Sequence, residues 1–216
     1  KVINEGGSLS TGTNGGNPAI TVSGADAVTL IFACGTDYKM ELPNFRGEDP
    51  HKAVTARINA AAKKGYEALK ADHVADHDAL FSRVELGFDE EIPQIPTDEL
   101  IKKYRNMIEN NGGDIPTSAE QRALEIMCYQ FGRYLTIAGS RDGALPTNLQ
   151  GVWGEGWFTW YGDYHFNINV QMNYWPTMAS NLSECMKPYN DLLNVLKQAG
   201  RNAAAASFGI KSNPGE

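Results

Sequence analysis

An aromatic and mostly irregular stretch between Arg141 and Asn190 constrains this chain more than any other feature. It shows little helical periodicity before Val170, yet it contains all four tryptophans of the sequence, Trp153, Trp157, Trp160 and Trp175. A long irregular segment inside a compact domain is usually either a functional loop or disordered. Because disordered segments are poor in aromatic residues, we predict an ordered loop. Its Trp, Tyr, Asn, Gln and His residues suit a sugar, since aromatic faces stack on pyranose rings and amides and imidazole bond hydroxyls.

The sharpest pattern within this stretch is Asn167-Ile168-Asn169. In an extended strand, residues two apart point to the same side, so both carboxamides would lie together and Ile168 would turn into the core. Such a pair can orient a water molecule or hold a catalytic carboxylate without adding charge. The alternative is a polar loop that satisfies its own backbone through Asx turns, and the Asn-x-Asn spacing alone does not decide between them.

Charge and hydropathy exclude two classes of partner. The sequence has 19 Lys and Arg against 26 Asp and Glu, a net charge of −7, whereas nucleic-acid binding requires clustered basic residues. No apolar run approaches the roughly 18 residues that a membrane-spanning helix needs. We therefore predict no nucleic-acid partner and no membrane span.

The cysteines and histidines do not form a recognisable metal site. Cys34, Cys128 and Cys185 are far apart and no CxxC spacing occurs, so we interpret them as buried free thiols. His73 and His77 are four residues apart and share a helix face, which is a spacing that can bind metal, but no third ligand is in view. The sequence also lacks a phosphate-binding glycine loop, an HExxH motif and a GxSxG motif. We predict no metal and no cofactor.

The predicted secondary structure changes from β to α along the chain. Residues 1–45 contain two β-branched or apolar runs, 20–22 and 28–33, and the second is apolar on both faces, which predicts a place inside a sandwich. Helical spacing follows over 50–61, 65–84, 97–109, 119–137 and 188–206. Strands followed by helices indicate an all-β unit and then an all-α unit.

The helix over 119–137 has clear signals at its start and on one face. Ser118 can cap its first turn. Its apolar stripe is predicted to be core and consists of Leu124, Met127, Cys128, Phe131 and Leu135. Neither the β unit nor the α unit has enough elements to be complete, and the chain starts at Lys1 without a signal peptide. We therefore expect a processed or excised segment of a larger enzyme.

Several motifs resemble glycoside hydrolase family 95, the inverting 1,2-α-L-fucosidases and related α-L-galactosidases. The matching pieces run in order through most of the chain and are 24–30, 76–84, 132–135 with 140–141, 145–153, 164–169, 172–176 and 181–184. The resemblance implies a multidomain fold, β then α: the end of a β-sandwich over 1–45, a helical linker over 46–117, and the first helices of an (α/α)6 catalytic barrel over 118–216.

The resemblance also implies roles for particular residues. Asn167 and Asn169 match the two asparagines that position the catalytic water and its activating carboxylate. His165 lies beside the sugar and affects fucose-versus-galactose preference, while Gln150 and Trp153 line the pocket. The general acid and base lie beyond Glu216 in the family; the alternative within this chain is the pair Glu155 and Asp163, which are more simply surface or turn acids.

The activity implied is removal of terminal α-L-fucosyl residues from glycans by an inverting mechanism, which needs two carboxyls and no cofactor. Its partners are a fucosylated glycan or oligosaccharide and the remainder of the parent polypeptide. Two alternatives stay open: an α-L-galactosidase of the same family, and a non-catalytic carbohydrate-binding or interaction fragment. A periplasmic or secreted location is expected from glycan-degrading members of the family.

Overall fold

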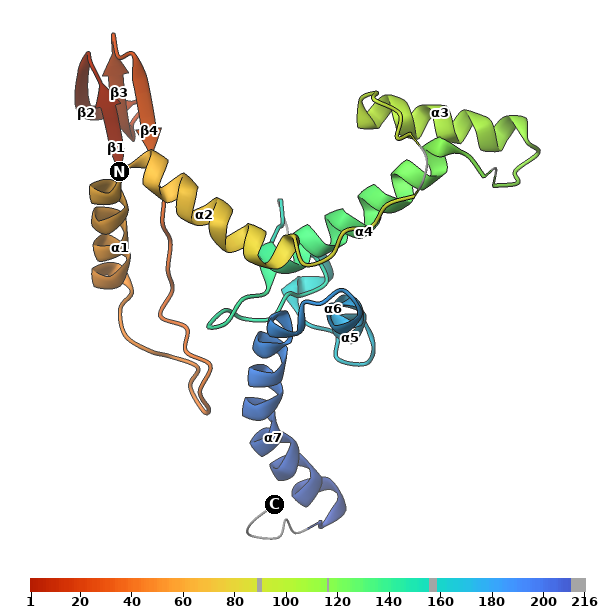
Figure 1. Ribbon diagram of the computed structural model, residues 1–216. Helices are drawn as coiled ribbons and strands as arrows, with labels where there is room; N and C mark the ends of the chain where they lie inside the picture. The colour runs from red at the N-terminus through yellow and green to blue at the C-terminus, as the bar shows by residue number, and fades with distance from the viewer. Residues whose placement is uncertain (89–90, 116, 156–158, 211–216) are drawn as a thin grey trace. The chain divides into compact units, whose positions relative to one another are not determined.

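The computed structural model describes residues 1–88, 91–115, 117–155 and 159–210, and about half of the chain is helical (Figure 1). It divides into two compact units, Lys1–Asp76 and His77–Glu216. The division falls inside one helix. The domain boundaries predicted at 45/46 and 117/118 stay predictions.

The first unit begins with an antiparallel ribbon of four strands, coloured red to orange in Figure 1. Strand β1 (Val2–Glu5) pairs with β4 (Ala27–Leu30), and β2 (Ser8–Asn14) pairs with β3 (Asn17–Ser23). The two pairs form separate two-stranded sheets. The predicted strand over 28–33 therefore ends earlier, at Leu30. Leu30 and Phe32 are 74% and 87% exposed, so the covering strands that a sandwich requires are not among the described residues.

Two helices follow the ribbon at the predicted positions. Helix α1 (His51–Lys64) begins directly after Pro50. It is followed by Gly65, whose φ of 83° is a conformation that glycine adopts without strain. Helix α2 (Tyr66–Phe81) crosses from the first unit into the second. Among the described residues, the first unit has no buried side chain. The first buried residue along the chain is Leu80, which belongs to the second unit.

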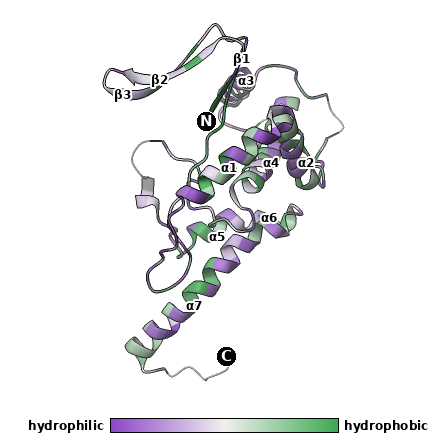
Figure 2. Ribbon diagram, turned by 90° about the vertical axis from the view of Figure 1, so that its left-hand side faces the viewer, coloured by the Kyte–Doolittle hydropathy of each residue, from purple (hydrophilic) through white to green (hydrophobic). Residues whose placement is uncertain are grey.

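The second unit contains three long helices: α3 (Thr97–Asn110), α4 (Ala119–Gly139) and α7 (Lys187–Phe208). The predicted cap of α4 is confirmed, since the Ser118 hydroxyl accepts the N–H of Gln121 at 3.2 Å. Lys103 of α3 bonds Glu120 of α4 at 2.5 Å, and this hydrogen bond lowers the pKa of the Glu120 carboxyl. Figure 2 shows hydrophobic and hydrophilic residues interleaved along α7.

Short elements fill the aromatic stretch between α4 and α7. They are the 3₁₀ turn η1 (Thr159–Gly162), α5 (Asn169–Tyr174), α6 (Pro176–Ala179) and the 3₁₀ turn η2 (Ser183–Met186). The described part of 141–168 otherwise has no helix or strand, as its lack of periodicity predicted. Trp157, one of the tryptophans that defined the stretch, lies outside the described residues.

A small core joins the end of α2 to α4 and η2. Leu80, Ile137, Leu182 and Cys185 pack together with Phe81 against them. The predicted core stripe of α4 lies elsewhere on the helix, and it is not buried in this chain: Met127 and Phe131 are 38% and 60% exposed, and Cys128 is exposed as well. The face that α4 buries instead contains Ala123, Arg133 and Ile137, because this face meets α2 and the 180–185 turn.

Candidate functional site

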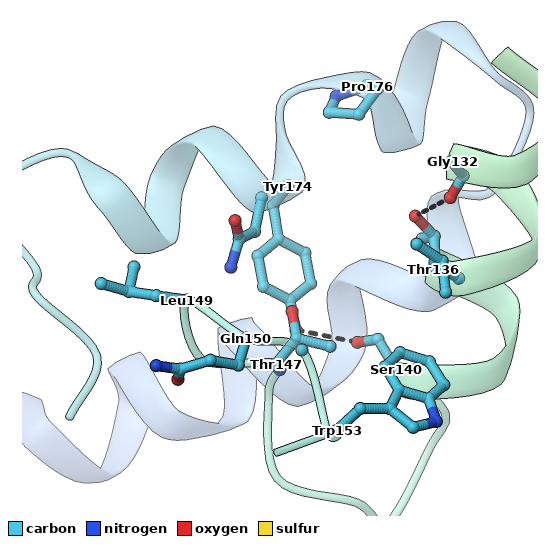
Figure 3. A pocket seen from close by; sticks show the side chains of 12 residues that line it. Gly132, Thr136, Ser140, Thr147, Leu149, Gln150, Trp153, Tyr174 and Pro176 are labelled. Atoms are coloured by element: carbon cyan, nitrogen blue, oxygen red, sulfur yellow. Dashed lines mark hydrogen bonds between the residues drawn. The ribbon is translucent and has the colours of Figure 1, made fainter. Parts of the chain in front are cut away.

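A pocket of about 380 Å³ lies where the C-terminal half of α4, the 147–153 loop and α5 meet (Figure 3). The residues that line it come from these three parts and from the first residue of α6: Gly132, Leu135, Thr136, Ser140, Thr147, Leu149, Gln150, Gly151, Trp153, Asn173, Tyr174 and Pro176. A monosaccharide fits a space of this size, since small-molecule pockets start at roughly 300 Å³.

A buried chain of hydrogen bonds forms one wall of this pocket. The Thr147 N–H donates to the Tyr174 hydroxyl at 2.9 Å, and the hydroxyls of Tyr174 and Ser140 are 2.9 Å apart. The Ser140 hydroxyl donates to the Cys185 carbonyl at 2.8 Å. Because serine has one hydroxyl proton and it is used there, the Tyr174 hydroxyl must donate to Ser140. The chain therefore has one direction, from the Thr147 amide to the Cys185 carbonyl.

The pocket loop reverses direction in a tight turn from Asn148 to Gly151. The Gly151 N–H donates to the Asn148 carbonyl at 3.0 Å, and the Gln150 N–H donates to the Asn148 side-chain oxygen at 2.9 Å, an Asx turn. Gly151 has a φ of 71°, and a Cβ there would stand 3.0 Å from the Trp153 ring. Glycine is therefore needed at this position both for the backbone conformation and for the close approach of the indole.

The structure brings Gln150 and Trp153 together on this pocket, the two residues that the resemblance assigned to it. The Trp153 indole is 46% exposed and also approaches Gly139 at the end of α4, where a Cβ would lie 3.6 Å from its ring. One apolar face and one amide are the groups that sugar binding uses. Their roles in binding stay predictions.

The Asn167-Ile168-Asn169 segment is not an extended strand, and that prediction is wrong. Residues 166–168 form a turn, and α5 begins at Asn169. Val170 and Tyr174, four residues apart, are both buried at 0% and 4% exposure, so a helical period is needed from Asn169 onward. Ile168 is 43% exposed rather than turned into the core.

Asn167 is exposed and Asn169 is half-buried, and neither is among the described residues that line the pocket. Their side chains make no hydrogen bond within the part of the chain that the structure describes. The two amides are therefore open to a ligand.

His165 lies in a strained turn just before the two asparagines. Its φ is 47° and its N–H donates to the Asp163 carboxylate at 3.0 Å, while its Nδ1 lies against the same carboxylate without a hydrogen bond. The Trp160 ring meets the imidazole edge-on at 5.3 Å between centroids. Asp163 thus orients His165, while Glu155 is exposed, and His165 does not line the pocket of Gln150 and Trp153.

The pocket is equipped to hold a neutral ligand rather than to transfer protons. None of the described residues that line it is Asp, Glu or His. Below it, burial raises the pKa of the Cys185 thiol, which keeps that group neutral. Among the described residues, no three His, Cys, Asp or Glu side chains gather as a metal site would require. No described helix is both long and apolar enough to cross a membrane.

Sequence reasoning did not assign roles to Ser140, Thr147, Asn173 and Tyr174. All four lie inside motifs that carried the family resemblance, but nothing in their spacing shows that they meet. Ser140 and Tyr174 are 34 residues apart in the chain. Only the packed structure reveals the contact.

Comparison with known proteins identifies the family of this chain. The catalytic-domain profile of glycosyl hydrolase family 95 matches residues 65–213, and the chain belongs to that family. The match includes residues 65–117, most of the stretch predicted as a linker. The resemblance seen in the motifs is thereby confirmed.

Named relatives point the same way. The chain is 37% identical over 174 residues to "Probable alpha-fucosidase A" of Aspergillus niger, which covers 76% of this chain and 20% of that protein. It is 32% identical over 210 residues to "Alpha-L-fucosidase 2" of Arabidopsis thaliana, covering 96% of this chain and 24% of that protein. The chain thus spans only about a fifth to a quarter of the length of these relatives.

Proposed function

We propose that the parent protein is a glycoside hydrolase that removes terminal α-L-fucosyl residues from glycans and that this chain supplies part of its sugar site. The observation that carries the proposal is the pocket that combines the Trp153 indole and the Gln150 amide without any lining acid, in a chain of glycosyl hydrolase family 95. The names of its fucosidase relatives support L-fucose as the sugar. The substrate is a fucosylated glycan, and the location is periplasmic or extracellular.

In this proposal the chain contributes three pieces of a larger fold. Residues 1–45 are the end of a β-sandwich, 46–117 a helical linker, and 118–216 the start of an (α/α)6 barrel. Two observations support it. Ile20, Val28 and Leu30 of the ribbon are exposed, and so are Met127, Cys128 and Phe131 of the α4 stripe. Faces of this kind need partner elements to be stable in water.

The proposed mechanism is a single displacement with inversion. A general acid protonates the leaving oxygen while a base activates water on the opposite face, with the two carboxyls about 6.5–9.5 Å apart. Both carboxyls come from the remainder of the parent polypeptide. Asn167 and Asn169 hold the water and orient the base, and no cofactor takes part.

The turn at 166–168 changes how the two amides would cooperate. Residues two apart in a chain have α-carbons at most about 7 Å apart, and the proposal requires both side chains to turn toward one water molecule. Neither amide has a hydrogen bond within the described chain that would compete for it.

Two other functions are distinguishable from this one. An α-L-galactosidase of the same family would use the same chemistry on a sugar with one more hydroxyl, and position 165 would decide the preference. A non-catalytic carbohydrate-binding role is favoured by the absence of Asp, Glu and His from the described pocket lining. Hydrolysis rates of aryl α-L-fucoside and aryl α-L-galactoside by the full-length protein separate all three.

The test of the asparagine pair uses Asn167→Asp and Asn169→Ala in the full-length protein. We expect kcat on the fucoside to fall by on the order of 100-fold with KM changed much less, because the amides act on the water rather than on the bound sugar. The matched control is Asn194→Ala on the exposed part of α7. An unchanged kcat in both variants would remove the water-positioning role, and no fucose release by the wild type would end the proposed activity.

A further inference from the structure

Three consecutive residues of the pocket loop are each held through their backbone by a side chain from the segment 164–174. The Tyr164 hydroxyl donates to the Pro146 carbonyl at 3.2 Å. The Thr147 N–H donates to the Tyr174 hydroxyl at 2.9 Å, and the Asn173 amide donates to the Asn148 carbonyl at 2.6 Å. A loop held at three successive residues has little freedom to shift relative to its anchor.

In two of these contacts, the oxygen atom that takes part makes a second hydrogen bond as well. The Asn148 carbonyl accepts both the Gly151 N–H that closes the turn and the Asn173 amide. The Tyr174 hydroxyl accepts from Thr147 and donates to Ser140, and the Tyr174 side chain is buried with its ring stacked on Tyr189 at 5.0 Å. Buried hydrogen bonds are costly to break without a replacement partner. The Tyr174 bond is buried and the Asn173 bond is partly buried, so Tyr174 is the firmer of the two anchors.

The anchors belong to the same short helix as one of the candidate water-positioning amides. Helix α5 begins at Asn169 and ends with Asn173 and Tyr174. With a rise of 1.5 Å per residue, its two ends are only about 7.5 Å apart. The same rigid turns thus present Asn169 at one end and, at the other end, hold the loop of Gln150 and Trp153.

We propose that Asn173 and Tyr174 are positioning residues, which fix the sugar-holding loop 146–153 relative to Asn167 and Asn169. This inference rests on the proposed function. Gln150 and Trp153 hold the sugar and the asparagine pair holds the water, so the distance between the two groups sets the alignment of water and anomeric carbon. An error of about 1 Å in such an alignment can lower the rate on the order of 100-fold.

The first experiment is Tyr174→Phe in the full-length protein, with Tyr189→Phe as its control. Each change removes one hydroxyl and keeps the ring, and the two rings stack on each other. We expect amide hydrogen exchange in the peptide 146–153 to accelerate about tenfold for Tyr174→Phe, since the Thr147 N–H loses its acceptor. kcat/KM on the fucoside should fall by on the order of tenfold to a hundredfold, and neither change should occur in Tyr189→Phe.

A double-mutant cycle distinguishes positioning from a merely structural role. If Tyr174 acts through the loop that carries Trp153, the loss in kcat/KM caused by Tyr174→Phe must be smaller in a Trp153→Ala background. A residue that only stabilises the fold would lower Tm and leave kcat/KM additive. Full additivity of the two substitutions would overturn the proposal.

Asn173→Asp tests the second anchor with nearly unchanged shape, because the carboxylate cannot donate to the Asn148 carbonyl. The same accelerated exchange and loss of kcat/KM are expected, and Asn194→Asp should show neither. Unchanged exchange over 146–153 in both anchor variants would overturn the inference. Faster exchange with unchanged kcat/KM would also overturn it, because the loop would then not set the reaction geometry.

Failure of this inference and failure of the proposed function give different results. A wild-type protein that does not hydrolyse fucosides contradicts the function, whereas the exchange measurement does not require activity. An active wild type whose anchor variants exchange and react like it contradicts only the positioning role.

Discussion

Trp153 is the side chain that we propose to stack on the sugar, and it lines the pocket beside Gln150. Its indole approaches two glycines, Gly139 and Gly151, where a Cβ would lie 3.6 Å and 3.0 Å from the ring. The sequence Gly-Val-Trp therefore places an aromatic face at the pocket because the glycine leaves room for it. This local requirement could be read from the sequence, although the identity of the second glycine could not.

For Trp153→Ala in the full-length protein we expect KM for the fucoside to rise about fivefold to thirtyfold, equivalent to about 1–2 kcal/mol of lost stacking. kcat should change less, because the indole is not expected to touch the reacting atoms. Trp153→Phe keeps an aromatic face and should recover most of the affinity. Equal KM values for wild type and Trp153→Ala would show that the pocket does not hold the sugar.

At the scale of elements, Arg133 connects α4 to the C-terminal end of α2. It is 3% exposed, and its guanidinium donates to the carbonyls of Leu80 at 3.0 Å and Phe81 at 2.7 Å. It also donates to the Val84 and Ser180 carbonyls at 3.1 and 3.3 Å. A cation is favourable there, since the last carbonyls of a helix lack intrahelical partners and carry the negative end of its dipole.

We expect Arg133→Met to destabilise the full-length protein by about 2–4 kcal/mol, because several buried carbonyls lose their donor. Arg133→Lys should recover only part of this, since one ammonium cannot reach carbonyls on two sides as the planar guanidinium does. Thermal unfolding measures the effect, with the exposed Arg105→Met as control, expected within about 0.5 kcal/mol of wild type. A Tm for Arg133→Met equal to that of the control would contradict this role.

At the scale of the whole molecule, the chain's exposed apolar faces set its behaviour in isolation. Phe131 and Tyr134 on α4 are 60% and 44% exposed and stack at 5.9 Å, and Phe208 near the end of α7 is 78% exposed. Large exposed apolar patches mark surfaces that another element covers. The chain accounts for only 20–24% of its relatives' length, so those proteins contain many residues outside the matched part.

We predict that the isolated 216-residue chain releases no fucose, because the described pocket lining contains no Asp, Glu or His. It should also bind a hydrophobic dye far more strongly than the full-length protein, because in our proposal further elements of that protein cover the α4 stripe. Fucose release and dye fluorescence, measured on both proteins, check the two parts. Measurable hydrolysis by the isolated chain would contradict the placement of acid and base in the rest of the parent.

The sequence by itself determined the family, the five long helices and the irregular aromatic segment. These follow from local physics: helical spacing and the Ser118 cap depend on neighbours a few residues away. The motif 145–153 likewise identified Gln150 and Trp153, which the structure places on one pocket.

Only the tertiary structure decided which faces are buried and where the aromatic segment becomes helical. Arg133 rather than Phe131 lies inside because α2, more than 50 residues away in sequence, packs against that side of α4. Asn169 starts a helix because Val170 and Tyr174 must both reach the interior. Which face is buried and where a helix begins depend on the distant segment that packs against each element. Local residue preferences do not contain that information.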